Sequence, residues 1–425
     1  MHLRTVFLGN MLLLAAPALA TDGQPESVSV TGRDDKRLAP LDRLMTDFVT
    51  RHKLPGASLA VVRHGRLVYA RGFGLADCES GEVMKPTSLF RIASLSKPVT
   101  SVAVLKLVEA GRLKLDDSVA EILKLKPEVD AKRNRRVTVR QCLQHTGGWD
   151  RGDSFDPMFQ SIRIARVLGT KAPAGPAEVI RFMQKWPLDF DPGTRYSYSN
   201  YGYCLLGRVI EKVSGQSYEQ YVRKQVLKPM GVTRMRVGRT RADGRARGEV
   251  RYHVDGAKVG LSVFDEDLGQ KVSRAYGAWN LEAMDSHGGW IASAVDMVRF
   301  ASALESPDHK PFLKAGLLEE MFAPPAGPVS RKSDGSVEDV YYGLGFSVRR
   351  LADGGMNQWH SGSLDGTSTL LVRRHDGMVW AVLFNSRRSC GGKNPASAID
   401  PLVHGAVDAV TEWPEGDAFD ELLVK

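Results

Sequence analysis

Apolar residues near both ends of the chain follow the patterns of amphipathic helices and strands. Helical spacing predicts a helix over about 41–52, which Pro55-Gly56 ends. Two apolar runs then flank His64-Gly65, and a similar pair flanks 375–377, each typical of two antiparallel strands joined by a tight turn. A last helical pattern covers about 396–413. Strands at both termini with helices between them predict an α+β fold, in which one antiparallel sheet carries helices on its faces.

A buried helix is predicted between these two ends. Pro98, which a helix accepts only in its first turn, precedes a run over 99–110 that is apolar on nearly every face and stops at Gly111. The helix therefore begins close to Ser94 and brings Lys97 to the same face. Burial lowers the pKa of a lysine, and a nearby base is what a serine hydroxyl needs to become a nucleophile. An S-x-x-K pattern is also common by chance, and a serine before a helix is often only its N-cap.

Tyr198, Ser199 and Asn200 precede a second apolar helix over about 203–213, which ends at Gly215. An adjacent cation favours the phenolate form of a tyrosine, and an asparagine amide can hold both a substrate carbonyl and a lysine. Taken alone, the tyrosines of this stretch are more typical of packing aromatics with one polar edge.

A third polar cluster, His360-Ser361-Gly362-Ser363, leads into the late pair of strands. A glycine before a strand edge allows a substrate backbone to approach closely. A lone histidine at such a place is more often an ordinary half-buried residue, whose charge depends on its contacts. A catalytic site is therefore predicted only from the three clusters together.

The three clusters occur in the order S-L-S-K, Y-S-N and H-S-G, within the longer stretches FRIASLSKPVTS, QHTGG, PGTRYSYSNYGYCLLG, GGWIASAVDMVRF and WHSGSLDG. In this order and context they resemble the serine beta-lactamase-related family, which includes class C beta-lactamases, D-alanyl-D-alanine carboxypeptidases and family VIII-type carboxylesterases. The resemblance covers about 41–386. It implies a beta-lactamase/transpeptidase-like fold, with a central antiparallel sheet flanked by helices and a helical subdomain.

The resemblance gives a role to the first two clusters. Ser94 would be the acylated nucleophile, and Lys97 would be its partner in proton transfer. Tyr198 would be the general base for acylation and the acid for the leaving group. Asn200 would bind the ester or amide side of the substrate and help to orient Lys97.

The third cluster would complete the site. His360 stands where many family members have lysine, and it would hydrogen-bond Tyr198 or a substrate carboxylate. Gly362 would let the substrate approach, and the backbone N–H groups of Ser94 and Ser363 would form the oxyanion hole. The resemblance implies no cofactor and no metal.

We expect residues 39–425 to form one hydrolase domain with a helical insertion over about 111–280. A polar, loosely ordered lead-in over 21–38 would precede it. Stretches 150–175 and 237–280 are rich in Gly, Arg and Asp and lack clear periodicity, so they are predicted to be long surface or site-rimming loops.

The N-terminus has the pattern of a signal peptide over 1–20. Arg4 precedes an apolar core over 6–16, and Ala18-Leu19-Ala20 is a small-residue cleavage site, so we expect cleavage after Ala20 and a secreted or periplasmic protein. The core is too short for a comfortable membrane span, and no other stretch approaches the roughly 18 to 20 apolar residues that a span requires. An uncleaved anchor is the alternative.

Charge and cysteine content change this picture little. The formal net charge is +9, but the basic clusters at 132–136 and 239–247 lack interleaved aromatics and any nucleic-acid-binding motif, so no nucleic-acid partner is expected. The cysteines have no metal-ligand spacing; two could pair in an oxidising compartment, whereas Cys142 and Cys204 are equally consistent with buried thiols. The four cysteines are Cys78, Cys142, Cys204 and Cys390.

The leading functional prediction is a secreted serine hydrolase that cleaves an ester, amide or peptide bond in a small molecule or peptide, cell-wall fragments included. A neutral imidazole at His360 attracts a carboxylate less than an ammonium does, so a carboxylesterase or a D-alanyl-D-alanine carboxypeptidase-like enzyme is favoured over a dedicated beta-lactamase. The alternative is a penicillin-binding sensor or structural homologue that is acylated without efficient turnover. The sequence does not define the oligomeric state.

Overall fold

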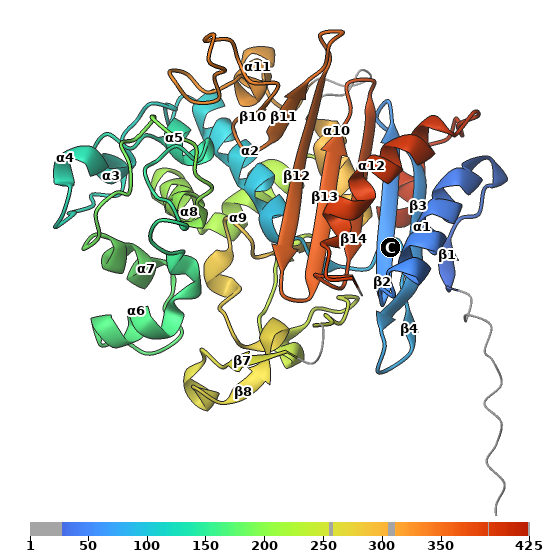
Figure 1. The fold of residues 1–425 in the computed structure, drawn as a ribbon, viewed down its shortest axis with the longest axis horizontal. Coiled ribbons are helices and arrows are strands. Elements are labelled where there is room, and N and C mark those ends of the chain that lie inside the picture. Colours follow the sequence, from blue (N-terminus) through green and yellow to red (C-terminus); the bar gives the residue numbers. More distant parts are fainter. Residues whose placement is uncertain (1–27, 255–257, 305–310, 390, 424–425) are drawn as a thin grey trace, which may run out of the picture.

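A nine-stranded antiparallel sheet forms the centre of the computed structural model, which describes residues 28–254, 258–304, 311–389 and 391–423 (Figure 1). Across the sheet, the strands are β1 (Val30–Gly32), β3 (Arg66–Asp77), β2 (Gly56–Arg63), β14 (Met378–Phe384), β13 (Thr367–Arg373), β12 (Met356–Leu364), β11 (Ser347–Arg350) and β10 (Val340–Tyr342), with β4 (Glu82–Val83) paired to β3. Strands from the N-terminal and C-terminal parts of the chain therefore meet at β2 and β14, and the prediction of an α+β sheet built from both termini is confirmed.

The turn between β2 and β3 forms where the sequence predicts it. Both turn residues, His64 and Gly65, have positive φ angles, of 47° and 82°. Two such residues in succession match the twist of a two-residue hairpin.

Both faces of the sheet are buried, which explains why its central strands read as continuous apolar runs. Successive side chains of a strand point to opposite faces. One core takes Met378, Trp380, Val382 and Phe384 of β14, and the other takes Val379, Ala381 and Leu383.

Helices cover the two faces in different ways. On one face lie α1 (Ala39–Arg51) and α12 (Pro395–Asp408), and on the other lie α2 (Ser96–Glu109) and α10 (Ala294–Ala303). Eleven of the fourteen residues of α2 are buried, as expected for a helix that is apolar on nearly every face. In Figure 1, α2 lies between the main sheet and a second group of helices.

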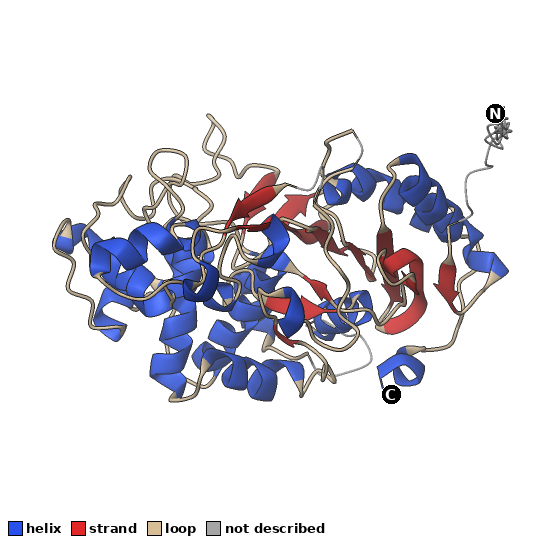
Figure 2. Cartoon of the chain, turned by 90° about the horizontal axis from the view of Figure 1, so that it is seen from below, coloured by secondary structure: helices blue, strands red, loops and turns tan. Residues whose placement is uncertain are grey.

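A second group of helices gathers in one half of the molecule, and the strands of the main sheet lie in the other (Figure 2). These helices are α3 (Val119–Ile122), α4 (Ala131–Asn134), α5 (Val139–Leu143), α6 (Ser161–Leu168), α7 (Pro176–Met183), α8 (Asn200–Ser214) and α9 (Tyr218–Val222), with a π-helical turn at Arg223–Leu227. The remaining elements are the small sheet of β5 (Phe90–Arg91), β9 (Trp290–Ala292) and β6 (Arg236–Val237), the β7 (Val259–Leu261) and β8 (Lys271–Ser273) hairpin, α11 (Ala315–Phe322) and α13 (Phe419–Leu423).

Two stretches predicted to be loops contain regular structure. Helix α6 lies within 150–175 and buries Ile164 and Ala165, and the β7–β8 hairpin lies within 237–280. Both elements are short and are flanked by irregular backbone, so their periodicity is weak in the sequence.

The structure bears on the cysteines and on membrane spans, but not on the signal peptide, which falls outside the described residues. Cys142 and Cys204 are buried free thiols, and Cys78 is an exposed one, whereas Cys390 also lies outside the described part. Within the described ranges, no helix combines the length and apolar character needed to cross a membrane.

Candidate active site

Ser94 lies in a single 3-10 turn, Ala93–Leu95, that joins β5 to α2. Ala93 has φ = 48°, a left-handed conformation that non-glycine residues adopt only when the surroundings fix it. Thr369 of β13 supplies one such contact, because its hydroxyl donates a hydrogen bond to the carbonyl of Ile92 at 2.9 Å. The turn is thereby tied to an interior strand of the main sheet.

Gly362 of β12 passes directly against this turn. A Cβ at this position would lie 2.4 Å from the carbonyl oxygen of Ile92 and 3.1 Å from the amide nitrogen of Ser94. Both atoms are main chain and cannot move aside, so glycine alone lets β12 approach Ser94 this closely.

The Lys97 amino group is fully buried and has three polar neighbours. Its Nζ lies 3.3 Å from Ser94 Oγ, 2.8 Å from Asn200 Oδ1 and 3.0 Å from the carbonyl oxygen of His287. The two carbonyl oxygens can only accept, so they take two N–H groups and leave the third position directed at Ser94. Burial is the main reason that the pKa of Lys97 falls well below its ordinary value. A neutral amine in this position can accept the Ser94 proton.

Tyr198 completes the surroundings of the serine. Its hydroxyl is hydrogen-bonded to Ser94, and its ring centre lies 4.6 Å from Lys97 Nζ. Burial raises the pKa of Tyr198 far above its ordinary value, and the bond to Ser94 offsets only part of that rise. In this resting state the phenolate that an adjacent cation would favour does not form, because desolvation outweighs both the bond to Ser94 and the smaller effect of the Arg151 cation.

Asn200 is the first residue of α8 and uses both ends of its amide. Its Oδ1 accepts from Lys97, and its Nδ2 donates to Asp156 Oδ2 at 2.6 Å. Ser199 is the N-cap of the same helix, and its hydroxyl accepts from the Gly202 amide at 3.2 Å. The cap fixes the start of α8 and therefore the place of Asn200.

His360 of β12 is neutral and has a partner at each ring nitrogen. Its Nδ1 lies 2.8 Å from the carbonyl oxygen of Ser361, which requires a proton on Nδ1, and its Nε2 accepts from the Tyr342 hydroxyl at 2.9 Å. Burial, with a smaller effect of Lys97, lowers the pKa of His360 to about 3. Tyr342 occupies the nitrogen with which His360 would bond Tyr198, so that bond does not form among the described residues. The expected contact of His360 with a substrate carboxylate stays a prediction.

His145, from the QHTGG stretch, packs beneath the tyrosines. Its ring centre lies 4.3 Å from that of Tyr198 and 4.6 Å from that of Tyr342, and its Nδ1 accepts from the Ser199 amide at 3.1 Å. Burial lowers the pKa of His145 well below its ordinary value, so the ring is neutral with its proton on Nε2. His145 thus acts as a packing surface for Tyr198.

Ser363 lies beside the guanidinium group of Arg387. Its Oγ accepts from Arg387 Nε at 3.1 Å, and Arg387 also pairs with Asp365 at 3.1 Å. Asp365 is shared with Arg274, whose Nε lies 2.9 Å away. Two guanidinium groups and one carboxylate leave a net positive charge here.

The structure brings together all of the predicted site residues and adds neighbours that the sequence did not single out. Ser94, Lys97, Tyr198 and Asn200 are in direct contact, and Gly362 touches the Ser94 turn. Asp156 and Tyr342 were missed, because neither lies in a motif. Only the QHTGG stretch gave a signal for His145.

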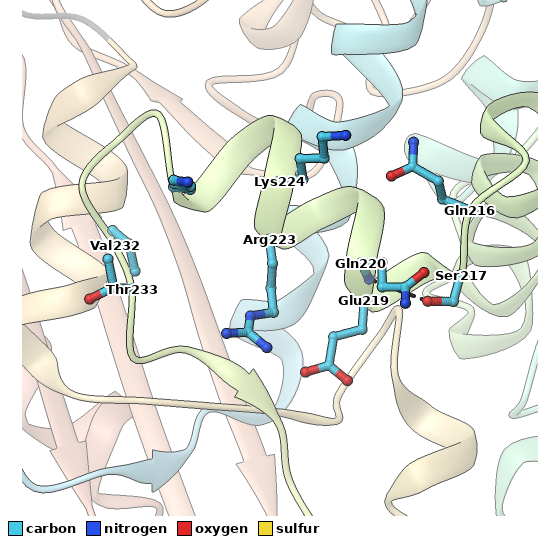
Figure 3. Close-up of a pocket in the computed structure, with 9 residues that line it drawn as sticks. Gln216, Ser217, Glu219, Gln220, Arg223, Lys224, Val232 and Thr233 are labelled. Atoms are coloured by element: carbon cyan, nitrogen blue, oxygen red, sulfur yellow. Dashed lines mark hydrogen bonds between the residues drawn. The ribbon is translucent and has the colours of Figure 1, made fainter.

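A groove of about 650 Å³ over α9 and the π-helical turn is separate from this cluster. Figure 3 shows Arg223 and Glu219 extending from the same side of these helices. The groove is lined by Gln216, Ser217, Glu219, Gln220, Arg223, Lys224, Lys228, Val232 and Thr233, none of which belongs to the Ser94 cluster.

Comparison with known families agrees with this geometry. The beta-lactamase family model matches residues 41–399. The chain belongs to the beta-lactamase family. This confirms the family that the three motifs resemble and, with it, the fold expected from them.

Individual relatives cover different shares of the chain. Penicillin-binding protein 4* of Bacillus subtilis (strain 168) is 28% identical over 340 residues, which are 79% of this chain and 69% of that protein. Esterase EstB of Burkholderia gladioli is 34% identical over 202 residues, 46% of this chain and 50% of the esterase. Protein flp of Staphylococcus aureus (strain N315) is 30% identical over 194 residues, 45% of this chain and only 37% of flp.

Solved structures agree on the fold. The octameric penicillin-binding protein homologue from Pyrococcus abyssi matches with a TM-score of 0.65 at 26% identity, covering 87% of this chain and 77% of that one. D-amino acid amidase from Ochrobactrum anthropi SV3 matches with a TM-score of 0.66 at 21% identity, covering 88% of this chain and 99% of the amidase, which indicates a shared fold alone.

Proposed function

We propose that this protein is a serine hydrolase that cleaves carboxylic esters or amides through a covalent acyl-enzyme on Ser94. The observation that carries the proposal is the position of Lys97. Two acceptors hold its Nζ at 2.8 and 3.0 Å, and the remaining direction points at Ser94 Oγ, 3.3 Å away. A buried, neutral amine next to a serine is an arrangement that activates the hydroxyl.

Acylation follows from the protonation states of the two neighbours of Ser94. The Ser94 oxygen attacks the carbonyl carbon of the substrate, and its proton passes to Lys97, whose pKa is lowered by burial. The bond to the leaving alcohol or amine then breaks, and the leaving group takes the Tyr198 phenol proton. Transfer of the Lys97 proton to the Tyr198 phenolate restores both residues, so charge and protons balance. In this scheme Lys97 accepts the Ser94 proton, and Tyr198 is the general acid that protonates the leaving group.

The oxyanion would be held by main-chain N–H groups. The Ser94 amide belongs to the first turn of a helical segment, where N–H groups lack intrahelical acceptors. Ser363 follows Gly362 on the strand that touches this turn. Removing one donor of such a pair typically lowers the rate by about 100-fold or more. Water then hydrolyses the acyl-enzyme and regenerates Ser94.

A neutral ester is the substrate class that the third cluster favours. His360 carries no charge near neutral pH, and Tyr342 occupies its Nε2. The cluster therefore lacks the ammonium with which a lysine would bind a substrate carboxylate. The similarity to an esterase supports this assignment.

A peptidase or penicillin-binding activity is the second candidate, because Arg387 lies beside Ser363 and could attract a carboxylate. The similarity to a penicillin-binding protein supports it. In this case Arg387→Gln would lower the rate of penicillin acylation by about tenfold relative to hydrolysis of a neutral ester. The exposed neighbour Arg388, changed to Gln, is the matched control.

The test of the proposed function is the hydrolysis of a short-chain nitrophenyl ester by the wild type, Ser94→Ala and Ser80→Ala. Ser80 is exposed in the turn between β3 and β4, so its loss should leave the rate unchanged. We expect Ser94→Ala to abolish hydrolysis while its melting temperature stays that of the wild type. Equal rates in the wild type and Ser94→Ala would contradict the proposal.

We also propose that the enzyme acts outside the cytoplasm, on the basis of the signal-peptide pattern over 1–20. The mass of the exported protein should then correspond to a chain that begins at Thr21. A full-length chain confined to the cytoplasm would contradict export.

A further inference from the structure

We infer that Asp156 is a positioning residue of this site, which holds Lys97 through the amide of Asn200 and balances the positive charge that Lys97 gains when it accepts the Ser94 proton. The inference rests on the proposed function, since it concerns the residue proposed as the proton acceptor. Asp156 lies in the stretch between α5 and α6, far from the three motifs in the sequence.

A continuous chain of hydrogen bonds connects Asp156 to the nucleophile. Asp156 Oδ2 accepts from Asn200 Nδ2 at 2.6 Å, Asn200 Oδ1 accepts from Lys97 Nζ at 2.8 Å, and Lys97 Nζ lies 3.3 Å from Ser94 Oγ. The other carboxylate oxygen, Oδ1, accepts from the Met158 amide at 3.1 Å and caps the 3-10 turn that follows. The carboxylate is therefore fixed by main chain on one side and supports Asn200 on the other.

The carboxylate decides which way the Asn200 amide faces. An amide can be turned over with little change in shape, and the reversed orientation would direct its NH₂ group at Lys97 and its oxygen at Asp156. A carboxylate has no hydrogen to donate, so it accepts only the NH₂ end. Asn200 Oδ1 is thereby committed to Lys97, and one of the two N–H groups of the amine is directed away from Ser94.

Asp156 is also the acid that acts on Lys97 within the described residues. Burial lowers the pKa of Lys97, Asp156 opposes this effect, and Arg151 adds to it. The titratable and charged side chains around Lys97 are Arg151, Asp156, Tyr198, Tyr203, His145, His287 and His360. The three histidines have lowered pKa values and the two tyrosines raised ones, so all five are neutral near neutral pH. Asp156 alone in this set can supply negative charge.

Two substitutions test the charge and the contact. Asp156→Asn removes the charge and keeps the shape of the side chain, and its single amide oxygen can accept from Asn200 only if the bond from the Met158 amide is given up. Asp156→Ala removes the charge and both bonds. Because a carboxylate raises the pKa of a neighbouring lysine, its removal should move the Lys97 limb of the pH profile of kcat/KM toward acid by about one pH unit. The shift of this limb is toward acid whether Lys97 titrates on the acidic or the basic side of the profile.

The experiment measures kcat/KM against pH for nitrophenyl ester hydrolysis by the full-length chain and its variants. We expect Asp156→Asn to shift one limb toward acid by about one unit with a loss at the optimum of less than about tenfold. For Asp156→Ala, kcat/KM should fall by about 100-fold, which is the effect of misplacing a catalytic group by about 1 Å. Asp156→Glu, which keeps the charge, should return the limb to within a few tenths of a unit of the wild-type position.

Asp153 provides the matched control. It lies in the same stretch and pairs with Arg195 at 2.8 Å on the surface, so Asp153→Asn removes a charge of the same sign without touching the Lys97 chain. Its pH profile should coincide with that of the wild type.

The outcomes distinguish failure of the Asp156 role from failure of the proposed function. Wild-type hydrolysis that depends on Ser94, together with unmoved limbs in Asp156→Asn and Asp156→Ala, would overturn the role of Asp156 and leave the proposed function standing. Equal shifts in Asp153→Asn and Asp156→Asn would also overturn it, because the effect would then be a general one of surface charge. Absence of Ser94-dependent hydrolysis in the wild type would overturn both proposals.

Discussion

The Tyr342 hydroxyl donates a hydrogen bond to Nε2 of His360 at 2.9 Å, across the intervening strand β11. The bond and the opposite contact of Nδ1 with the Ser361 carbonyl fix one neutral tautomer of the imidazole. The third motif of this site is thus a neutral, fully bonded histidine, whereas a lysine there would be a cation. That difference motivates the proposal of neutral substrates.

The buried histidines make the stability of the fold depend on pH. The folded pKa of His360 is lowered to about 3 from an ordinary value of 6.5, so the unfolded chain binds a proton more readily than the folded one. The stabilisation is complete above pH 6.5 and is lost as the pH falls from 6.5 toward 3. The free energy of unfolding, measured with urea, should be lower at about pH 5 than at about pH 7.5, and this group should account for about 2 kcal/mol of the difference. His360→Gln, which does not titrate, should show a smaller loss, and an identical loss in this variant would contradict the assignment.

Gly362→Ala should damage both activity and stability. The added Cβ would lie 2.4 Å from the carbonyl oxygen of Ile92 and 3.1 Å from the amide nitrogen of Ser94, so either β12 or the turn that holds Ser94 must move. We expect the rate of acylation to fall by about 100-fold and the free energy of unfolding by about 1–3 kcal/mol. Gly316 of α11 is the control, since a Cβ there meets nothing within 4 Å. Wild-type acylation by Gly362→Ala would mean that β12 does not shape the site.

Tyr198→Phe should affect substrates according to their leaving groups. Burial keeps the Tyr198 phenol protonated, which suits it to protonate a departing alkoxide. Nitrophenolate leaves without that help, whereas the alkoxide of an ethyl ester does not. We therefore expect kcat to fall by at least about 100-fold for the ethyl ester and by much less for the nitrophenyl ester. Equal losses with both esters would instead assign Tyr198 to the removal of the Ser94 proton.

Much of the fold follows from sequence periodicity. The β2–β3 and β13–β14 pairs, α1, α2 and α8 all lie where apolar spacing and turn residues predict them. The last helix ends at Asp408 rather than near 413. Helix α6 was missed although Ile164 and Ala165 form a buried stripe, because a helix of eight residues gives too short a pattern to stand out from the loops around it.

The site was predictable only where it lies in motifs. The local sequence encodes the start of α2 through Pro98, the start of α8 through the Ser199 cap, and the close approach of β12 through Gly362. These three features bring Ser94, Lys97, Tyr198 and Asn200 together. Asp156 and Tyr342 reach the site through tertiary packing and carry no local signal.

The protonation states could be predicted only in part: the lowered pKa of Lys97 and the neutral imidazole of His360 agree with the sequence-based expectations, whereas the raised pKa of Tyr198 does not. The pKa values of Tyr198 and His360 are set mainly by desolvation, and the depth of burial emerges only when β10, β12 and α8 are packed. A motif gives the identity of a titratable residue but not the extent to which the fold removes it from water.

The most direct test of the central claim is the intact mass of the protein, followed over milliseconds to minutes after mixing with a slowly hydrolysed ester or a penicillin, with peptide mapping of any adduct. We predict an added mass equal to the acyl group, located on Ser94 and absent from Ser94→Ala. A transient adduct with ester and a scarce or slow one with penicillin would support an esterase, and a lasting penicillin adduct would support the penicillin-binding alternative. Hydrolysis of the ester with no adduct on Ser94 at any time, or an adduct on another residue, would contradict the acyl-enzyme account.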